Sequence, residues 1–158
     1  MSDYDRFEAL LGEPSLVHLD ASILALHVAG IPASLPLTRV LFQLMESGDI
    51  TAQTSALSLY QLLMESYRRG EETTADRVER LLGALPGLTL IPLDGRIARQ
   101  AAQVRARIGG KLERSVQLAT ALSEDADLFL TRHSSLRRVA GMRVESLDAY
   151  TAQPADPA

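Results

Sequence analysis

Asp20 is the residue of this sequence best placed for chemistry. It follows the mostly apolar stretch Ser15-Leu16-Val17-His18-Leu19, and a helical pattern begins directly after it. A buried parallel strand of this kind carries its last side chain to the carboxyl edge of a sheet, where open α/β folds bind ligands. Carboxylate oxygens suit hard divalent cations, although one carboxylate alone seldom holds Mg²⁺ tightly. We therefore looked for the partners of Asp20 in the elements that surround it.

Strands alternate with helices along most of the chain, which predicts an α/β fold: a three-layer sandwich with a parallel sheet of about five strands and helices on both faces. The predicted strands are Leu16–Leu19, Asp49–Ala52, Leu88–Pro92, Leu128–Thr131 and Met142–Glu145. The predicted helices are Ile23–Ala29, Leu35–Ser47, Ser55–Arg69, Thr73–Leu85, Gly95–Arg107, Glu113–Ser123 and a short Ser134–Val139. We expect Leu16–Leu19 at the centre of the sheet.

Capping residues place several helix starts. Ser22 is a plausible N-cap of the first predicted helix, Thr54 or Ser55 of the third, and Asp94 of the fifth.

His18, inside the first strand, is expected to pack against a helix and to have no catalytic role.

Length and composition predict one domain, residues 1–150, followed by a disordered tail, 151–158. The chain has no cysteine, which excludes disulfides and cysteine-ligated metal centres. Aromatic residues make up only 4% of the 158 residues, so the core must be aliphatic and a base-stacking surface is not expected. No apolar run is long enough to cross a bilayer, and the start of the chain is acidic and polar, so we expect a cytoplasmic protein.

Charge is unevenly distributed. Residues 1–95 carry 6 basic and 13 acidic residues, whereas residues 96–143 carry 10 basic and 4 acidic residues. The segment Arg96–Arg143 could therefore meet the phosphates of RNA. Solvated arginines on ordinary helices are the simpler interpretation of the same pattern.

Four segments, in order and spread over nearly the whole chain, resemble the PIN domain, the nuclease fold of VapC-type toxins in bacterial toxin–antitoxin pairs. They are Leu19-Asp20-Ala21-Ser22, the stretch from Thr54 to Gln61, the stretch from Leu112 to Ala121, and Phe129-Leu130-Thr131-Arg132-His133 with the following Leu136-Arg137-Arg138-Val139. The resemblance implies a five-stranded parallel sheet and a cleft where three or four carboxylates hold Mg²⁺ or Mn²⁺ for phosphodiester hydrolysis.

The sequence departs from the family at most of these acidic positions. Asp20 matches the first ligand of the family, but Gln61, Arg114 and His133 stand where the resemblance implies carboxylates. The Arg114 guanidinium would repel a metal ion, so we expect no metal and an ion pair between Asp20 and Arg114, with Gln61 and His133 hydrogen-bonded nearby.

Two further sets of residues complete the predicted site. Ser22, Ser55 and Thr131 are expected to support the cleft. Glu65 and Glu113 could rebuild the acidic site with Asp20, and His133 could ligate a transition metal. Glu65 as a surface partner of Arg68 or Arg69, and Glu113 as a favourable charge at a helix N-terminus, are the simpler interpretations.

The leading hypothesis is a PIN-like protein that has lost metal-dependent ribonuclease activity and acts by binding, either to a protein partner such as an antitoxin or to RNA through Arg96–Arg143. The alternative is an active ribonuclease that uses Mg²⁺ or Mn²⁺ at a site rebuilt from Asp20, Glu65 and Glu113. A homodimer is also expected, with helices Leu35–Ser47 and Ser55–Arg69 as candidate interface.

Overall fold

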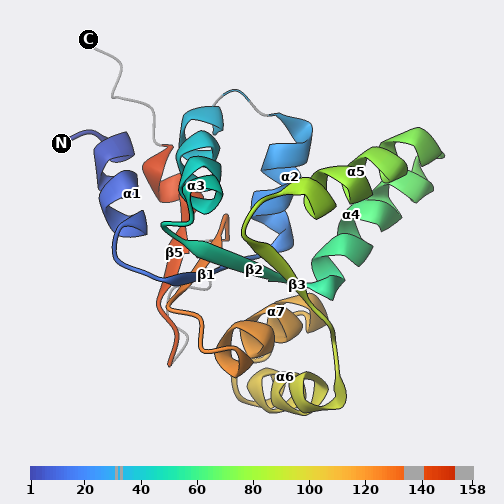
Figure 1. Cartoon of the computed structure of the whole chain (residues 1–158). Helices are drawn as coiled ribbons and strands as arrows, with labels where there is room; N and C mark the ends of the chain where they lie inside the picture. The colour runs from blue at the N-terminus through green and yellow to red at the C-terminus, as the bar shows by residue number, and fades with distance from the viewer. Residues whose placement is uncertain (31, 33, 134–140, 152–158) are drawn as a thin grey trace, which may run out of the picture.

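The computed structural model, which describes residues 1–30, 32, 34–133 and 141–151, is built on a sheet of five parallel strands (Figure 1). The strand order is β3-β2-β1-β4-β5, so β1 lies at the centre of the sheet, as predicted. The strands are β1 (Leu16–Leu19), β2 (Thr51–Ser55), β3 (Leu88–Ile91), β4 (Leu128–Thr131) and β5 (Val144–Ser146). His18 pairs with Gln53 of β2 and with Phe129 of β4.

Helices cover both faces of this sheet, which confirms the predicted three-layer α/β architecture (Figure 1). They are α1 (Asp3–Leu11), α2 (Ala21–Ala29), α3 (Leu35–Ser47), α4 (Ala56–Arg68), α5 (Glu72–Ala84), α6 (Gly95–Ile108), α7 (Leu112–Ser123) and the 3₁₀ helix η2 (Leu147–Tyr150). α6 and α7 lie together on one face, and α1 to α5 lie on the other (Figure 1).

Each face of the sheet buries its own aliphatic core. Val17 and Leu19 of β1 join the larger core beneath α1, α2 and α3. On the other face Phe129 packs with Leu118 and Ala121 of α7. Because side chains alternate along a strand, Val17 and Leu19 point to one face while His18 points to the other.

The helix α1 precedes the first strand and is fixed to the domain by apolar contacts. Phe7, Leu10 and Leu11 are buried in the larger core. The Phe7 ring lies 5.4 Å from the Tyr150 ring of η2. α1 is therefore packed as an integral part of the domain.

Element boundaries differ from the predictions by a few residues, and most clearly at two strands. β2 continues to Ser55, although the prediction ends it at Ala52, and β5 begins at Val144, two residues later than predicted. Both strands end in polar residues that the fold buries: Thr54, Ser55 and Ser146 are at most 1% exposed. The predicted helix 134–139 and the tail 152–158 lie outside the described residues.

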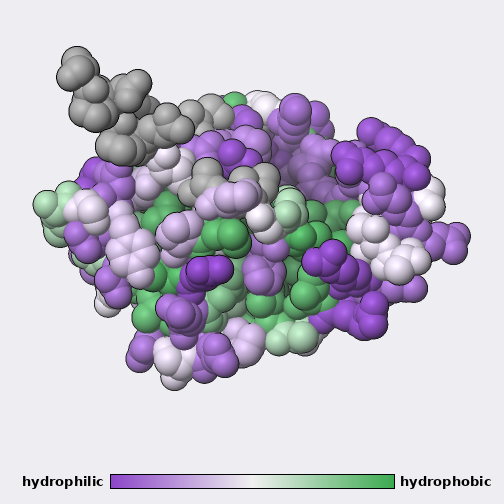
Figure 2. All heavy atoms as spheres, turned by 90° about the horizontal axis from the view of Figure 1, so that it is seen from above, coloured by the Kyte–Doolittle hydropathy of each residue, from purple (hydrophilic) through white to green (hydrophobic). Residues whose placement is uncertain are grey.

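Figure 2 looks down on the face that carries α2 and α3. Apolar residues gather at its centre, and hydrophilic residues border them on the side of α4 and α5. None of the described helices is long and apolar enough to pass through a bilayer.

Candidate functional site

Asp20 caps the helix that follows β1. Its Oδ1 accepts hydrogen bonds from the backbone N–H of Ser22 at 3.0 Å and of Ile23 at 3.4 Å, and from the Ser22 hydroxyl at 2.5 Å. Its Oδ2 accepts a hydrogen bond from the Thr131 hydroxyl of β4 at 2.5 Å. The prediction that Ser22 is the N-cap was wrong: the helix begins two residues earlier, at Ala21, and the carboxylate of Asp20 satisfies free N–H groups of α2.

Ser22 and Thr131 also support the chain that leaves β4. The Ser22 hydroxyl accepts a hydrogen bond from the backbone N–H of Arg132 at 3.1 Å, and the Thr131 hydroxyl accepts one from the N–H of His133 at 3.1 Å. Ser55 is buried and caps α4 through the N–H of Leu57. Ser22 and Thr131 therefore contact Asp20 directly, whereas Ser55 acts on the helix that carries Gln61.

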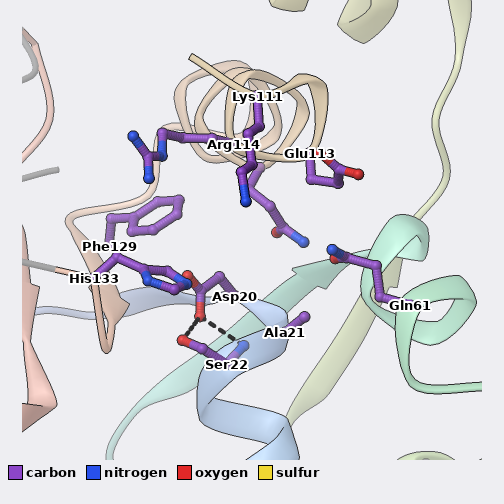
Figure 3. Close-up of a pocket in the computed structure, with 10 residues that line it drawn as sticks. Asp20, Ala21, Ser22, Gln61, Lys111, Glu113, Arg114, Phe129 and His133 are labelled. Atoms are coloured by element: carbon purple, nitrogen blue, oxygen red, sulfur yellow. Dashed lines mark hydrogen bonds between the residues drawn. The ribbon is translucent and has the colours of Figure 1, made fainter. Parts of the chain in front are cut away.

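A pocket of about 230 Å³ opens over Asp20 at the carboxyl edge of the sheet (Figure 3). Residues from β1, α2, α4, α7 and β4 surround it, and they include all four positions that the family resemblance singles out. Its lining is Asp20, Ala21, Ser22, Gln61, Lys111, Glu113, Arg114, Gln117, Phe129 and His133. Gln61 points its amide into this space from α4 (Figure 3).

Two cations enter the pocket from the start of α7. The side chains of Lys111 and Arg114 extend from this helix on the side opposite Asp20 and Ser22 (Figure 3). The predicted ion pair between Asp20 and Arg114 is not formed, because Asp20 instead accepts hydrogen bonds from Ser22, Ile23 and Thr131. Within the described part of the chain, no salt bridge engages Lys111 or Arg114.

A buried polar network lies beneath the pocket, and sequence reasoning missed it. The His18 Nδ1 accepts a hydrogen bond from the Gln53 amide at 3.1 Å, so its Nε2–H donates to the Gln117 carbonyl at 2.7 Å. The Gln117 amide donates in turn to the Ser58 hydroxyl at 2.7 Å. Burial lowers the pKa of His18 to about 4, so the ring is neutral near pH 7. His18 packs against α7, as predicted, and it positions a side chain of the pocket wall.

The alternation of polar residues along β1 and β2 is the sequence signal for this network. His18 and Gln53 stand opposite each other on neighbouring strands and are 0% and 2% exposed. Polar residues inside two central strands need buried hydrogen-bond partners. Gln117, in the middle of the predicted helix that faces the sheet, is the partner.

The donor set of this pocket does not fit a hard divalent cation. Mg²⁺ and Mn²⁺ require several oxygen ligands, but the Asp20 oxygens already accept four hydrogen bonds. The Glu113 side chain lines the pocket but extends toward the side of Gln61 and not toward Asp20, and Lys111 and Arg114 line the same pocket (Figure 3). Over residues 1–30, 32, 34–133 and 141–151, no three histidine, aspartate or glutamate side chains are grouped so that they could bind a metal ion.

Glu65 lies away from the pocket of Asp20. It forms ion pairs with Arg69 at 3.3 Å and Arg68 at 3.8 Å on the surface of α4. It lines a separate hollow between α2, α4 and α5, so the structure does not bring Glu65 and Asp20 together. The structure therefore agrees with the simpler interpretation of Glu65, a surface ion-pair partner of Arg68 and Arg69.

Three of the basic residues in Arg96–Arg143 are neutralised locally. Arg96 pairs with Glu124 at 2.8 Å, Arg132 with Asp148 at 2.9 Å, and Arg143 with Glu13 at 2.7 Å. The neighbouring Glu13 carboxylate raises the pKa of the exposed Arg143. Arg137 and Arg138 lie outside the described residues.

Comparison with known proteins agrees with this geometry. The sequence model of the PIN domain matches residues 17–142, which is most of the chain and leaves α1 outside the match. No curated protein sequence matches.

Solved structures of low sequence identity share the fold. VapBC2 from Rickettsia felis bound to a DNA fragment gives a TM-score of 0.68 at 15% identity, over 83% of this chain and 98% of that one. A toxin–antitoxin complex from Klebsiella pneumoniae gives 0.61 at 18% identity, over 83% and 97%. DNA-bound VapBC from Salmonella typhimurium gives 0.63 at 18% identity, over the same shares of the two chains.

Proposed function

Because this chain belongs to the PIN domain family, we propose that it has lost metal-dependent ribonuclease activity and acts by binding a protein partner. One observation carries the proposal: the pocket over Asp20 is lined by Lys111 and Arg114 where a nuclease of this kind needs further carboxylates. A fixed cation in that position opposes binding of Mg²⁺ or Mn²⁺ and cannot activate water as a metal does.

The similar solved structures include a toxin–antitoxin complex, which supports an antitoxin-like protein as the partner. The hollow of about 370 Å³ between α2, α4 and α5 suits a protein segment. Its floor is apolar, with Val28, Leu62 and Val78, and its rim carries Glu65 and Arg69. An apolar floor with a charged rim is the usual composition of a protein interface.

Metal binding tests the loss of activity directly. We expect no Mn²⁺ binding to the wild-type chain in calorimetry and no Mn²⁺-dependent cleavage of RNA. A reverted variant, Gln61→Glu with Arg114→Asp and His133→Asp, is the matched positive control, because it restores carboxylates around Asp20. That variant should bind Mn²⁺, and Asp20→Ala in the same background should abolish the binding.

Tight Mn²⁺ binding to the wild-type chain that disappears in Asp20→Ala would contradict the proposal. It would favour the alternative, an active ribonuclease with a site rebuilt from Asp20, Glu65 and Glu113, of which Asp20 and Glu113 line this pocket. RNA cleavage that is unchanged in Asp20→Ala would indicate a contaminating nuclease.

RNA binding without cleavage is the second candidate function. It is favoured by Arg99 and Arg107, two exposed arginines of α6 for which the described residues supply no salt-bridge partner. Binding through them would weaken steeply with salt, because phosphate contacts release counterions. Arg99→Gln with Arg107→Gln should then reduce the salt dependence of RNA binding measured by filter retention.

We also propose a homodimer, with a different interface from the one that the sequence favoured. On α3, Leu37, Val40 and Leu41 are buried in the larger core, and on α4 the exposed large hydrophobic side chains are the tyrosines Tyr60 and Tyr67. Exposed aliphatic side chains are found near β3, α6 and α7: Leu90, Leu93, Ile108 and Leu112 are 41% to 51% exposed. Light scattering tests the oligomeric state, and Leu112→Glu should favour the monomer.

A further inference from the structure

We infer that the pocket over Asp20 receives an aspartate or glutamate side chain of the protein partner, held by Lys111 and Arg114. This inference rests on the proposed function and names the chemistry by which the partner is recognised. It is based on two observations. Lys111 and Arg114 line a small polar pocket and form no salt bridge among the described residues. The Asp20 carboxylate in the same pocket already accepts hydrogen bonds from other groups.

Asp20 forms no ion pair with Lys111 or Arg114, because both of its carboxylate oxygens accept hydrogen bonds from other groups. Its Oδ1 faces the N-terminus of α2 and the Ser22 hydroxyl, and its Oδ2 faces the Thr131 hydroxyl. The Glu113 carboxylate extends toward the side of Gln61, and among the described residues it forms no salt bridge with either cation (Figure 3). Lys111 and Arg114 therefore have donors left for an incoming acceptor.

The position of Arg114 suits a planar acceptor. Its Nη1 and Cδ lie 3.8 Å from where a Cβ on Gly110 would stand, so the side chain lies against the glycine and remains partly buried. A guanidinium is planar and can donate two parallel hydrogen bonds to a carboxylate. Gln61 adds an amide donor from the opposite wall (Figure 3).

A carboxylate fits these observations better than an RNA phosphate. Lys111 and Arg114 are the two lysine or arginine side chains in the lining of this pocket, so it can contact one or two phosphates of a polyanion and no more. RNA affinity depends on several phosphate contacts in a row, but Arg132, which adjoins His133 of the pocket lining, is already paired with Asp148.

The pocket also offers no free phenyl ring for a base. Phe129 is 0% exposed and stacks on His18 with ring centroids 4.9 Å apart. A volume of about 230 Å³ is sufficient for one acidic side chain.

Fluorescence anisotropy with three labelled probes tests the inference on the full chain. The probes are a Glu–Gly repeat peptide, the matched Gln–Gly repeat peptide, and an oligouridine of equal length. We expect binding of the Glu–Gly peptide alone at low salt. Lys111→Gln and Arg114→Gln should each weaken it about tenfold, the loss expected when one charged hydrogen-bond donor is removed. Arg39→Gln, at an exposed arginine of α3 outside the pocket, is the matched control and should leave binding unchanged.

Three results would overturn the inference: no binding of the Glu–Gly peptide, equal binding by wild type and both pocket variants, or tighter binding of oligouridine that the pocket variants abolish. Circular dichroism of each variant checks that it is folded. Failure of the proposed function is detected separately, as Asp20-dependent cleavage of RNA with Mn²⁺, and that assay uses no peptide.

Discussion

Acid should destabilise this protein through His18 before most carboxylates titrate. The ring is fully buried between Gln53 and Gln117, and its Nδ1 accepts a hydrogen bond from the Gln53 amide. Protonation of Nδ1 would place a second donor against that amide and would bury an uncompensated charge. Burial accordingly lowers the pKa of His18 from 6.5 to about 4.

The sign of the effect follows from proton binding in the two states. The unfolded chain protonates His18 below pH 6.5, whereas the folded chain resists protonation until about pH 4. Stability is therefore complete above pH 6.5 and is lost as the pH falls toward 4. The whole difference is about 3 kcal/mol, at 1.36 kcal/mol per pH unit, and about 2 kcal/mol of it is lost between about pH 7 and about pH 5.

Urea denaturation at a series of pH values measures this loss. His18→Gln removes the titrating ring while keeping a polar side chain, so its stability should change with pH less than that of the wild type. His27→Gln is the matched control. Partial burial lowers the pKa of His27 as well, so this variant loses a contribution to the pH dependence of stability that has the same sign, but it keeps the contribution of His18. Identical pH dependence for wild type and His18→Gln in this range would refute the reasoning.

Three other substitutions test how the fold holds Asp20 and a tight turn. Asp20→Ala removes the cap of α2 and the acceptor of the Thr131 hydroxyl, and should cost about 2 kcal/mol in urea denaturation. Thr131→Val should cost about 1 kcal/mol or more, since it leaves one buried carboxylate oxygen of Asp20 without its hydrogen-bond donor. Gly87→Ala should lower the melting temperature more than Gly48→Ala. Both glycines have positive φ, but an added Cβ would approach a backbone oxygen only at Gly87, where the Met45 oxygen would be 3.1 Å away. An equal effect at the two glycines would mean that the contact is relieved by a small backbone shift.

The fold was predictable from apolar periodicity, except where polar residues are buried. The pattern of Leu35–Ser47 places α3 correctly, because its buried stripe is aliphatic. The prediction ends β2 at Ala52 and gives Thr54 or Ser55 as the helix cap, but β2 continues through Gln53 and Thr54, polar residues that are 2% and 0% exposed. Their burial depends on partners from β1 and α4, which local sequence does not reveal.

The site was predictable as a set of positions but not as a set of contacts. The family resemblance brings Asp20, Gln61, Arg114 and His133 to one pocket, and the structure places all four there. The predicted ion pair between Asp20 and Arg114 is not formed. Whether two side chains in one pocket meet depends on the directions in which they point, and spacing in the sequence does not determine these directions. Lys111 was missed because it stands just before α7, where a lysine ordinarily reads as surface charge.

The three altered positions and Asp20 differ in what they do for the fold. His133 is exposed, and Gln61 and Arg114 are partly buried at the rim of the pocket, so their replacement costs little packing. Asp20 is 6% exposed, caps α2 and ties the end of β1 to the end of β4. Its presence is therefore explained by folding alone and is no argument for a metal. The pocket can exchange a metal-binding role for recognition of a partner while the carboxylate at its base keeps its place.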